Sequence, residues 1–266
     1  MTAEHYVTAT LNYMNVDEGE IWVYDRGPGL PRRSYGDEVR ETPVYDARKA
    51  GLAATIDSDG FELIRCAADV AFNADPALVK ASYYPATERL VKKHLGAVRV
   101  HAFDHDFRST SVKHQSEHLR PAVMGVHNDY TESSGPQRVR DLLPGEAETL
   151  LQRRFAFINV WKPIGWPAEG TPLAMCDART LGPGDLTLIH LRYRDRNGEI
   201  YGGRYNQAQR WYYYPAMTTS EAVLLKVYDS DRSRARFTLH TAFVDPTAPK
   251  EAPARQSIEV RSIAFF

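Results

Sequence analysis

The chain has 266 residues, of which 43% are hydrophobic and 25% charged, as in ordinary globular proteins with a sizeable core. Its 33 lysines and arginines nearly balance its 34 aspartates and glutamates, so we expect neither a nucleic-acid-binding nor a membrane-surface protein. Two cysteines cannot form a disulfide framework, no apolar run approaches the ~20 residues that span a bilayer, and the start lacks a signal-peptide pattern, so we expect a cytoplasmic protein.

The N-terminal third shows a mixed pattern of strands, a loop and a helix. Apolar and β-branched residues predict strands at Tyr6–Met14, Glu20–Asp25 and Phe61–Cys66. The charged, glycine- and proline-rich stretch Arg26–Glu41 reads as a loop.

A helix is predicted to begin at Asp75-Pro76 and to end at Gly96. Aspartate is a favourable N-cap, proline at the first helical position loses no needed N–H group, and glycine commonly terminates helices. Pro85 lies inside the helical pattern, so we expect a kink or a break there.

The chain after Gly96 is dominated by short strand-like segments separated by turns. This pattern is typical of a sandwich, jelly roll or barrel, and it shows no boundary between two domains. We therefore predict one mainly β domain with flanking helices over residues 1–266, with a mixed buttress at 1–96 and the β core at 97–266. The predicted core strands are Ala97–His105, Ala122–Asp129, Arg153–Pro163, Pro172–Asp177, Asp185–Tyr193, Arg210–Pro215, Val223–Asp229, Ala235–Val244 and Ser257–Phe266.

Among nine histidines, only His127 has a carboxylate two residues further on, at Asp129. On an extended strand such residues project to the same face, so both can bind one metal ion. A second histidine would complete the 2-His-1-carboxylate triad that holds Fe(II) and leaves positions open for other ligands. His190 and His240 are the candidates, and small neighbouring residues favour His240. Isolated H-x-D pairs also arise by chance, and an isolated histidine is more often a hydrogen-bonded core residue.

The last predicted strand carries Arg255, Ser257 and Arg261 on one face. A guanidinium group binds a carboxylate through two parallel hydrogen bonds, and a neighbouring hydroxyl can add a third. We therefore predict that Arg255 and Ser257 bind the far carboxylate of a 2-oxo diacid whose other end chelates the metal. The alternative is a solvent-exposed face of an edge strand.

Several motifs together resemble the CmcJ/NvfI-like (gibberellin desaturase-like) non-haem Fe(II)/2-oxoglutarate-dependent oxygenases. They are HND followed by YTESS, then NVWKPI, PLAMCD, QRWYYYPAM, VYDSD, LHTAFVDP and RQSIEVR. The resemblance implies a double-stranded β-helix (jelly roll, cupin-like) core and the metal ligands His127, Asp129 and His240. It also implies that Arg255 and Ser257 bind 2-oxoglutarate. Because the interval from His240 to Arg255 is longer than in the wider superfamily, Arg261 stays an alternative.

Further side chains are predicted to line the pocket. Asn159 and Trp161 share strand parity, and Asn159 is expected to hydrogen-bond the co-substrate, although both can equally be core packing. Tyr130 and Thr131 follow the metal pair, and Arg210 begins an aromatic run. We expect Tyr130, Thr131, Trp161 and Arg210 to contact the substrate.

The predicted function is oxidation of a C–H bond in a small molecule by Fe(II), 2-oxoglutarate and O₂, by hydroxylation, desaturation or cyclisation, in specialised metabolism. In such enzymes the cofactor supplies the reactive chemistry and the protein supplies orientation. One alternative is a catalytically silent jelly-roll binding domain. Another is an iron oxidase that uses O₂ without 2-oxoglutarate. The sequence does not indicate an oligomeric state.

Overall fold

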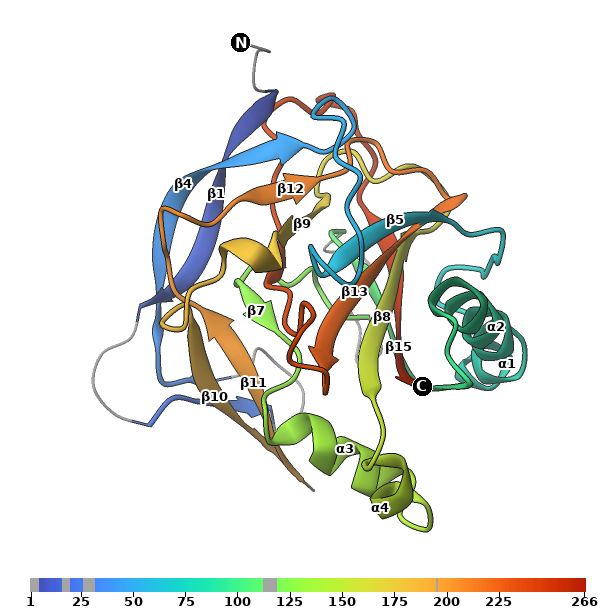
Figure 1. Cartoon of the computed structure of the whole chain (residues 1–266). Helices are drawn as coiled ribbons and strands as arrows, with labels where there is room; N and C mark the ends of the chain where they lie inside the picture. Colours follow the sequence, from blue (N-terminus) through green and yellow to red (C-terminus); the bar gives the residue numbers. More distant parts are fainter. Residues whose placement is uncertain (1–4, 16–19, 26–31, 112–118, 195) are drawn as a thin grey trace.

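The computed structural model describes residues 5–15, 20–25, 32–111, 119–194 and 196–266. Two β-sheets face one another, and the helices lie outside them (Figure 1). The smaller sheet has five strands in antiparallel neighbour pairs. In spatial order they are β5 (Phe61–Arg65), β13 (Glu221–Asp229), β8 (Phe155–Pro163), β15 (Gln256–Phe265) and β6 (Arg99–Ser109).

The larger sheet has ten strands, and only its β4–β12 and β2–β10 neighbours are parallel. In spatial order they are β1 (Tyr6–Asn15), β4 (Gly36–Asp46), β12 (Trp211–Tyr213), β9 (Leu173–Cys176), β14 (His240–Ala242), β7 (His127–Asn128), β11 (Asn197–Gly203), β10 (Leu186–Tyr193), β2 (Trp22–Asp25) and β3 (Arg32–Arg33). The two curled, facing sheets confirm the predicted jelly-roll class.

The loop predicted over Arg26–Glu41 is wrong at Arg32–Arg33, which form β3, and from Gly36 onward, and its residues 26–31 lie outside the described part of the chain. Strand β4 begins at Gly36 and pairs with β1 from Asn15↔Gly36 to Tyr6↔Tyr45. Its charged residues misled the prediction because most of them stay exposed at the surface while the backbone makes ladder hydrogen bonds.

The predicted helix from Asp75 to Gly96 is confirmed, with a break before Pro85. The Asp75 side chain accepts a hydrogen bond from the Ala77 amide at 2.7 Å, and Gly96 ends the helix with φ of 67°. The helix is divided into α1 (Pro76–Leu78), a π-helical turn (Val79–Tyr83) and α2 (Tyr84–Leu95).

Strand β8 is buried on both faces, and the alternation of its side chains separates two parts of the core. Phe157 and Trp161 point between the sheets, and Phe157 lies opposite Ile263 of β15, whereas Ile158 and Val160 point outward. The outward cluster also contains Val91 of α2, so this helix covers the outer face of the five-stranded sheet (Figure 1).

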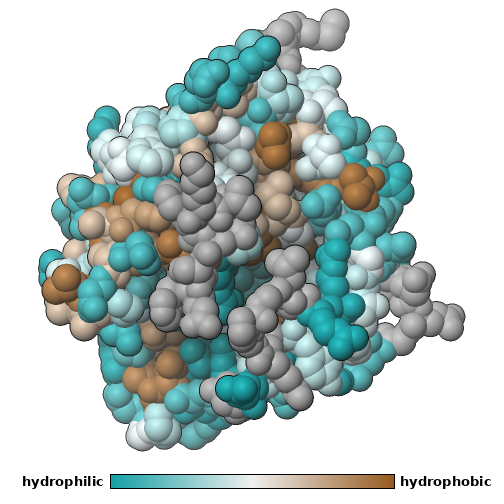
Figure 2. Space-filling view, turned by 180° about the vertical axis from the view of Figure 1, so that it is seen from behind, coloured by the Kyte–Doolittle hydropathy of each residue, from teal (hydrophilic) through white to brown (hydrophobic). Residues whose placement is uncertain are grey.

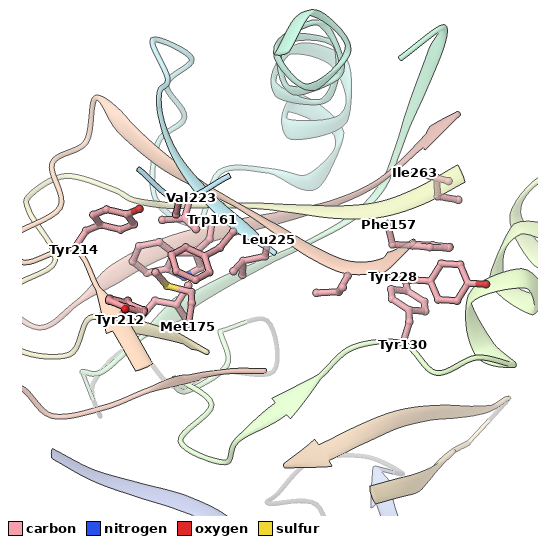
Figure 3. Packing of buried hydrophobic residues seen from close by; sticks show 14 of the residues in the cluster. Tyr130, Phe157, Trp161, Met175, Tyr212, Tyr214, Val223, Leu225, Tyr228 and Ile263 are labelled. Atoms are coloured by element: carbon pink, nitrogen blue, oxygen red, sulfur yellow. The ribbon is translucent and has the colours of Figure 1, made fainter. Parts of the chain in front are cut away.

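Figure 3 shows that the inner cluster has two ends: Trp161, Met175 and Leu225 at one, and Tyr130 with Phe157 at the other. Because Asn159 lies between Phe157 and Trp161 on the same face, it also points between the sheets.

Two further helices, α3 (Ser134–Leu142) and α4 (Ala147–Leu150), connect β7 to β8 at one end of the sheets, and Ala178–Thr180 forms a 3₁₀ turn (Figure 1). On the face seen in Figure 2, apolar groups are scattered among hydrophilic ones. No described helix is long and apolar enough to cross a membrane.

Candidate metal centre and co-substrate pocket

Three of the predicted ligands meet at the centre of the larger sheet. His127 of β7 and His240 of β14 are directly opposite each other on neighbouring antiparallel strands, and their ring centroids are 4.4 Å apart. Asp129 follows β7, and its Oδ1 lies 3.6 Å from Nε2 of His127. One ligand atom from each residue lies within 4.8 Å of the others. His190, the alternative third ligand, lies elsewhere, on β10: its Nδ1 is 3.7 Å from Oε1 of Glu199 on β11.

The two imidazoles are oriented by backbone carbonyl groups. Nδ1 of His127 lies 2.8 Å from the Gly125 oxygen, and Nδ1 of His240 lies 2.9 Å from the Thr238 oxygen. A carbonyl oxygen only accepts, so each Nδ1 carries the proton and each Nε2 keeps a lone pair for a metal. With the Asp129 carboxylate, these donors form the 2-His-1-carboxylate set that is typical of non-haem Fe(II) sites. The residues therefore fit the metal that the sequence predicts.

Asn128, between the first two ligands, was not singled out by the sequence reasoning. It is fully buried, and its amide nitrogen donates to the carbonyls of Tyr130 and Val227. Its side-chain oxygen accepts from the Thr238 amide at 3.0 Å. These bonds tie the segment that carries Asp129 to the segment that enters β14. The available sequence signal was its position in the H-N-D sequence: Asn128 has the opposite strand parity to the two ligands, so its side chain leaves the other face of the strand.

The Asp129 carboxylate is ionised despite being enclosed. Burial by itself raises the pKa of this group, but the positive charge of Arg261, with the hydrogen bond from Asn159, outweighs burial and holds the pKa below its ordinary range. Asn159 donates a hydrogen bond to Oδ2 of Asp129 at 2.6 Å, and Nε of Arg261 donates to the same oxygen at 3.4 Å.

Burial and the neighbouring His240 lower the pKa of His127 to about 4. In the metal-free protein, His127 is therefore protonated at a lower pH in the folded state than in the unfolded chain, where its pKa is about 6.5. The stabilisation is complete above pH 6.5 and is lost as the pH falls toward 4. We expect this residue to contribute a loss of about 2 kcal/mol in the free energy of unfolding between pH 7 and pH 5.

Urea denaturation of the metal-free protein at the two pH values measures this loss. His127→Gln should reduce the pH dependence by the same amount, because glutamine does not titrate. An identical pH dependence in wild type and variant would contradict the lowered pKa of His127.

A second set of polar atoms lies on the inner face of the five-stranded sheet. Arg255 and Ser257 are 3% and 1% exposed, and Nη1 of Arg255 donates to the Thr171 carbonyl at 3.0 Å. Among the described residues, Nε of Arg255, Oγ of Ser257 and Oδ1 of Asn159 have no hydrogen-bond partner. Leaving such groups unpaired costs about 1–3 kcal/mol each. An oxygen-rich ligand would pair with the two donors, so these residues fit the predicted dicarboxylate.

The cavity beside the triad has a volume of about 1080 Å³. Tyr130 lines it, together with His127, Asp129 and Arg261. Its charged walls were not predicted from the sequence. They are supplied by β6, α3 and the β10–β11 pair and include Asp104, Asp106, Arg108, Arg138, Asp141, Arg192 and Glu199.

The other three predicted substrate residues lie outside this lining. Thr131 is buried and bonds to Ser133, Ser134 and Glu199. The ring centroid of Trp161 lies 5.5 Å from Cζ of Arg255, within the core. Arg210 is exposed, with its guanidinium 4.5 Å from the ring centroid of Tyr45, because it precedes β12 at the surface.

A family model described as an oxidoreductase/YMDC permease-like domain matches residues 11–265. The Fe(II)/2-oxoglutarate-dependent dioxygenase nvfI of Aspergillus novofumigatus (strain IBT 16806) is 30% identical over 255 residues, covering 90% of this chain and 87% of that protein. The hydroxylase/desaturase efuI of Hormonema carpetanum is 31% identical over 289 residues, covering 98% and 95%.

A solved structure of the iron and alpha-ketoglutarate-dependent endoperoxidase NvfI superposes with a TM-score of 0.87 at 26% identity, covering 98% of each chain. The fold, the triad and these similarities agree. The chain therefore belongs to the family of Fe(II)/2-oxoglutarate-dependent dioxygenases that includes NvfI, a family that uses Fe(II), 2-oxoglutarate and O₂.

Proposed function

We propose that this protein is an Fe(II)/2-oxoglutarate-dependent oxygenase that oxidises a C–H bond of a small molecule. The observation that carries the proposal is the meeting of His127, Asp129 and His240 around one point beside a large cavity. When bound there, the metal together with 2-oxoglutarate and O₂ supplies the oxidising chemistry. The chain holds the metal, anchors the co-substrate and orients the substrate.

Arg255 and Ser257 are the proposed anchor for the far carboxylate of 2-oxoglutarate. Their side chains have unpaired donors, and both are enclosed, so a carboxylate there would be bound without competition from water. Arg261 is less suited, because its guanidinium already contacts the carboxylates of Asp104, Asp106 and Glu259 as well as Asp129.

The substrate is proposed to be a small molecule of specialised metabolism, contacted by Tyr130. Relatives carry names such as hydroxylase/desaturase efuI and aspirochlorine biosynthesis protein N, which supports this class of pathway. Hydroxylation, desaturation and cyclisation all begin with the same attack on a C–H bond. Two buried free cysteines, Cys66 and Cys176, support a cytoplasmic location.

An anaerobic absorption titration tests the proposal. We expect a broad visible band that appears only when Fe(II) and 2-oxoglutarate are both added, because the co-substrate must chelate a bound metal to produce it. Zn(II) in place of Fe(II) is the control and should give no band.

Two results would contradict the proposal. Fe(II) binding without the band, even at millimolar 2-oxoglutarate, would favour an iron oxidase that uses O₂ alone. Absence of metal binding at the triad would favour a catalytically silent binding domain.

A further inference from the structure

We infer that Asn159 and Arg261 are positioning residues for the metal centre, which together hold one oxygen of Asp129 so that only the other oxygen faces the two histidines. This inference rests on the proposed metal site. It gives both residues a role different from the co-substrate contacts that the sequence suggests.

The two oxygens of the Asp129 carboxylate have different partners. Oδ2 accepts hydrogen bonds from Nδ2 of Asn159 at 2.6 Å and from Nε of Arg261 at 3.4 Å. Oδ1 lies 3.6 Å from Nε2 of His127, the nitrogen that is free to bind a metal. Oδ2 is therefore occupied by protein donors, and Oδ1 is the oxygen available to the metal.

The two donors are fixed by the sheet. Asn159 of β8 and Arg261 of β15 are directly opposite each other in the antiparallel ladder, so their side chains leave the same face side by side. Asn159 must present its NH₂ group to Asp129, because a carboxylate only accepts hydrogen bonds. The strand register of the small sheet thus determines how the ligand of the large sheet is held.

Three further carboxylates orient the Arg261 guanidinium. Nη1 lies 3.1 Å from Oδ2 of Asp104, and Nη2 lies 2.9 Å from Oδ2 of Asp106 and 3.0 Å from Oε1 of Glu259. These contacts occupy the outer edge of the guanidinium and direct Nε toward Asp129. A planar fork of donors can satisfy several acceptors in fixed directions, which the single ammonium group of lysine cannot do.

A carboxylate without these donors could turn and offer both oxygens to the metal. The second oxygen would then take a position that the co-substrate or O₂ needs. Asn159 and Arg261 therefore support both the affinity for the metal and the open side of the site. Outer residues that orient metal ligands commonly account for 10–100-fold in metal affinity.

The test is a Co(II) titration of full-length Arg261→Lys and Asn159→Leu without 2-oxoglutarate, followed by calorimetry and visible absorption. We expect the dissociation constant for Co(II) to rise 10–100-fold in each variant. We also expect the Co(II) absorption bands to change, because their intensity depends on coordination number. Thermal unfolding establishes that each variant is folded, and Asn159→Leu carries the test alone if Arg261→Lys does not fold.

Arg154→Lys is the matched control. Arg154 also contacts two carboxylates, Asp57 and Asp229, but neither of them belongs to the triad. The dissociation constant of the Arg154→Lys protein for Co(II) should stay within about twofold of wild type.

Unchanged Co(II) affinity and spectrum in both variants would overturn the inference while leaving the metal site intact. A separate titration of the Co(II)-loaded Arg261→Lys protein with 2-oxoglutarate covers the alternative: a raised dissociation constant for 2-oxoglutarate with unchanged Co(II) affinity would also overturn the inference and make Arg261 a co-substrate anchor. Failure of wild-type protein to bind Co(II) would instead refute the proposed function and the inference together.

Discussion

His240→Ala should abolish the visible Fe(II)–oxoglutarate band and the consumption of 2-oxoglutarate. His240 supplies one of three protein ligands, and its Nε2 is free because Nδ1 is held by the Thr238 carbonyl. Alanine has no donor atom, so two ligands remain. We expect a loss of Fe(II) affinity beyond the roughly 100-fold that removal of an outer-sphere partner costs. Anaerobic titration with Fe(II) measures it.

His190→Ala is the matched control, because the sequence alone left His190 as the other candidate for the third ligand. It lies on β10 beside Glu199, on the wall of the same cavity, but it is not part of the group of three possible metal ligands. Fe(II) affinity in this variant should stay within about twofold of wild type. Turnover of 2-oxoglutarate by His240→Ala at the wild-type rate would refute the ligand assignment.

The sequence predicted the metal site as well as it did because strand parity is a local property. An H-x-D pair on an extended segment places His127 and Asp129 together whatever the rest of the fold. The choice of His240 over His190 rested on small neighbours and on resemblance. The structural reason is different: β14 is the strand that pairs with β7, whereas β10 is two strands away.

The network around Arg261 could not be predicted in this way. Parity places Arg255 and Arg261 on one face, but the pairing of β15 with β6 decides which of them meets carboxylates. That pairing brings Asp104 opposite Arg261 and Asp106 opposite Glu259, across more than 150 residues of chain. Sequence periodicity contains no information about register between such distant strands.

The substrate contacts were hardest to predict for the same reason. Tyr130 lines the cavity because it follows the metal ligands directly, whereas the walls come from segments that only the fold brings together. Arg210 begins an aromatic run in the sequence, but in the fold it precedes β12 at the surface.

Arg255→Met should raise the dissociation constant for 2-oxoglutarate by at least about 30-fold while leaving that for Fe(II) unchanged. Removing one partner of an enclosed charged pair commonly costs about 2–5 kcal/mol or more, which corresponds to this range. Titration of the Fe(II) protein with 2-oxoglutarate, followed by the anaerobic visible band, measures the effect. Lys162→Met is the control, because Lys162 is a buried cation that points to the outer face of β8 and donates to the Ala68 carbonyl.

Arg255→Met should not destabilise the protein in the absence of co-substrate. Burial and the nearby charge of Arg108 lower the pKa of Arg255 to about 9, which shows that its charge is poorly compensated before a ligand arrives. Methionine fills similar space without a charge, so thermal unfolding should occur at the wild-type temperature or above it. Added 2-oxoglutarate should raise the unfolding temperature of wild type but not of the variant. An undiminished response of the variant would place the co-substrate anchor elsewhere in the chain.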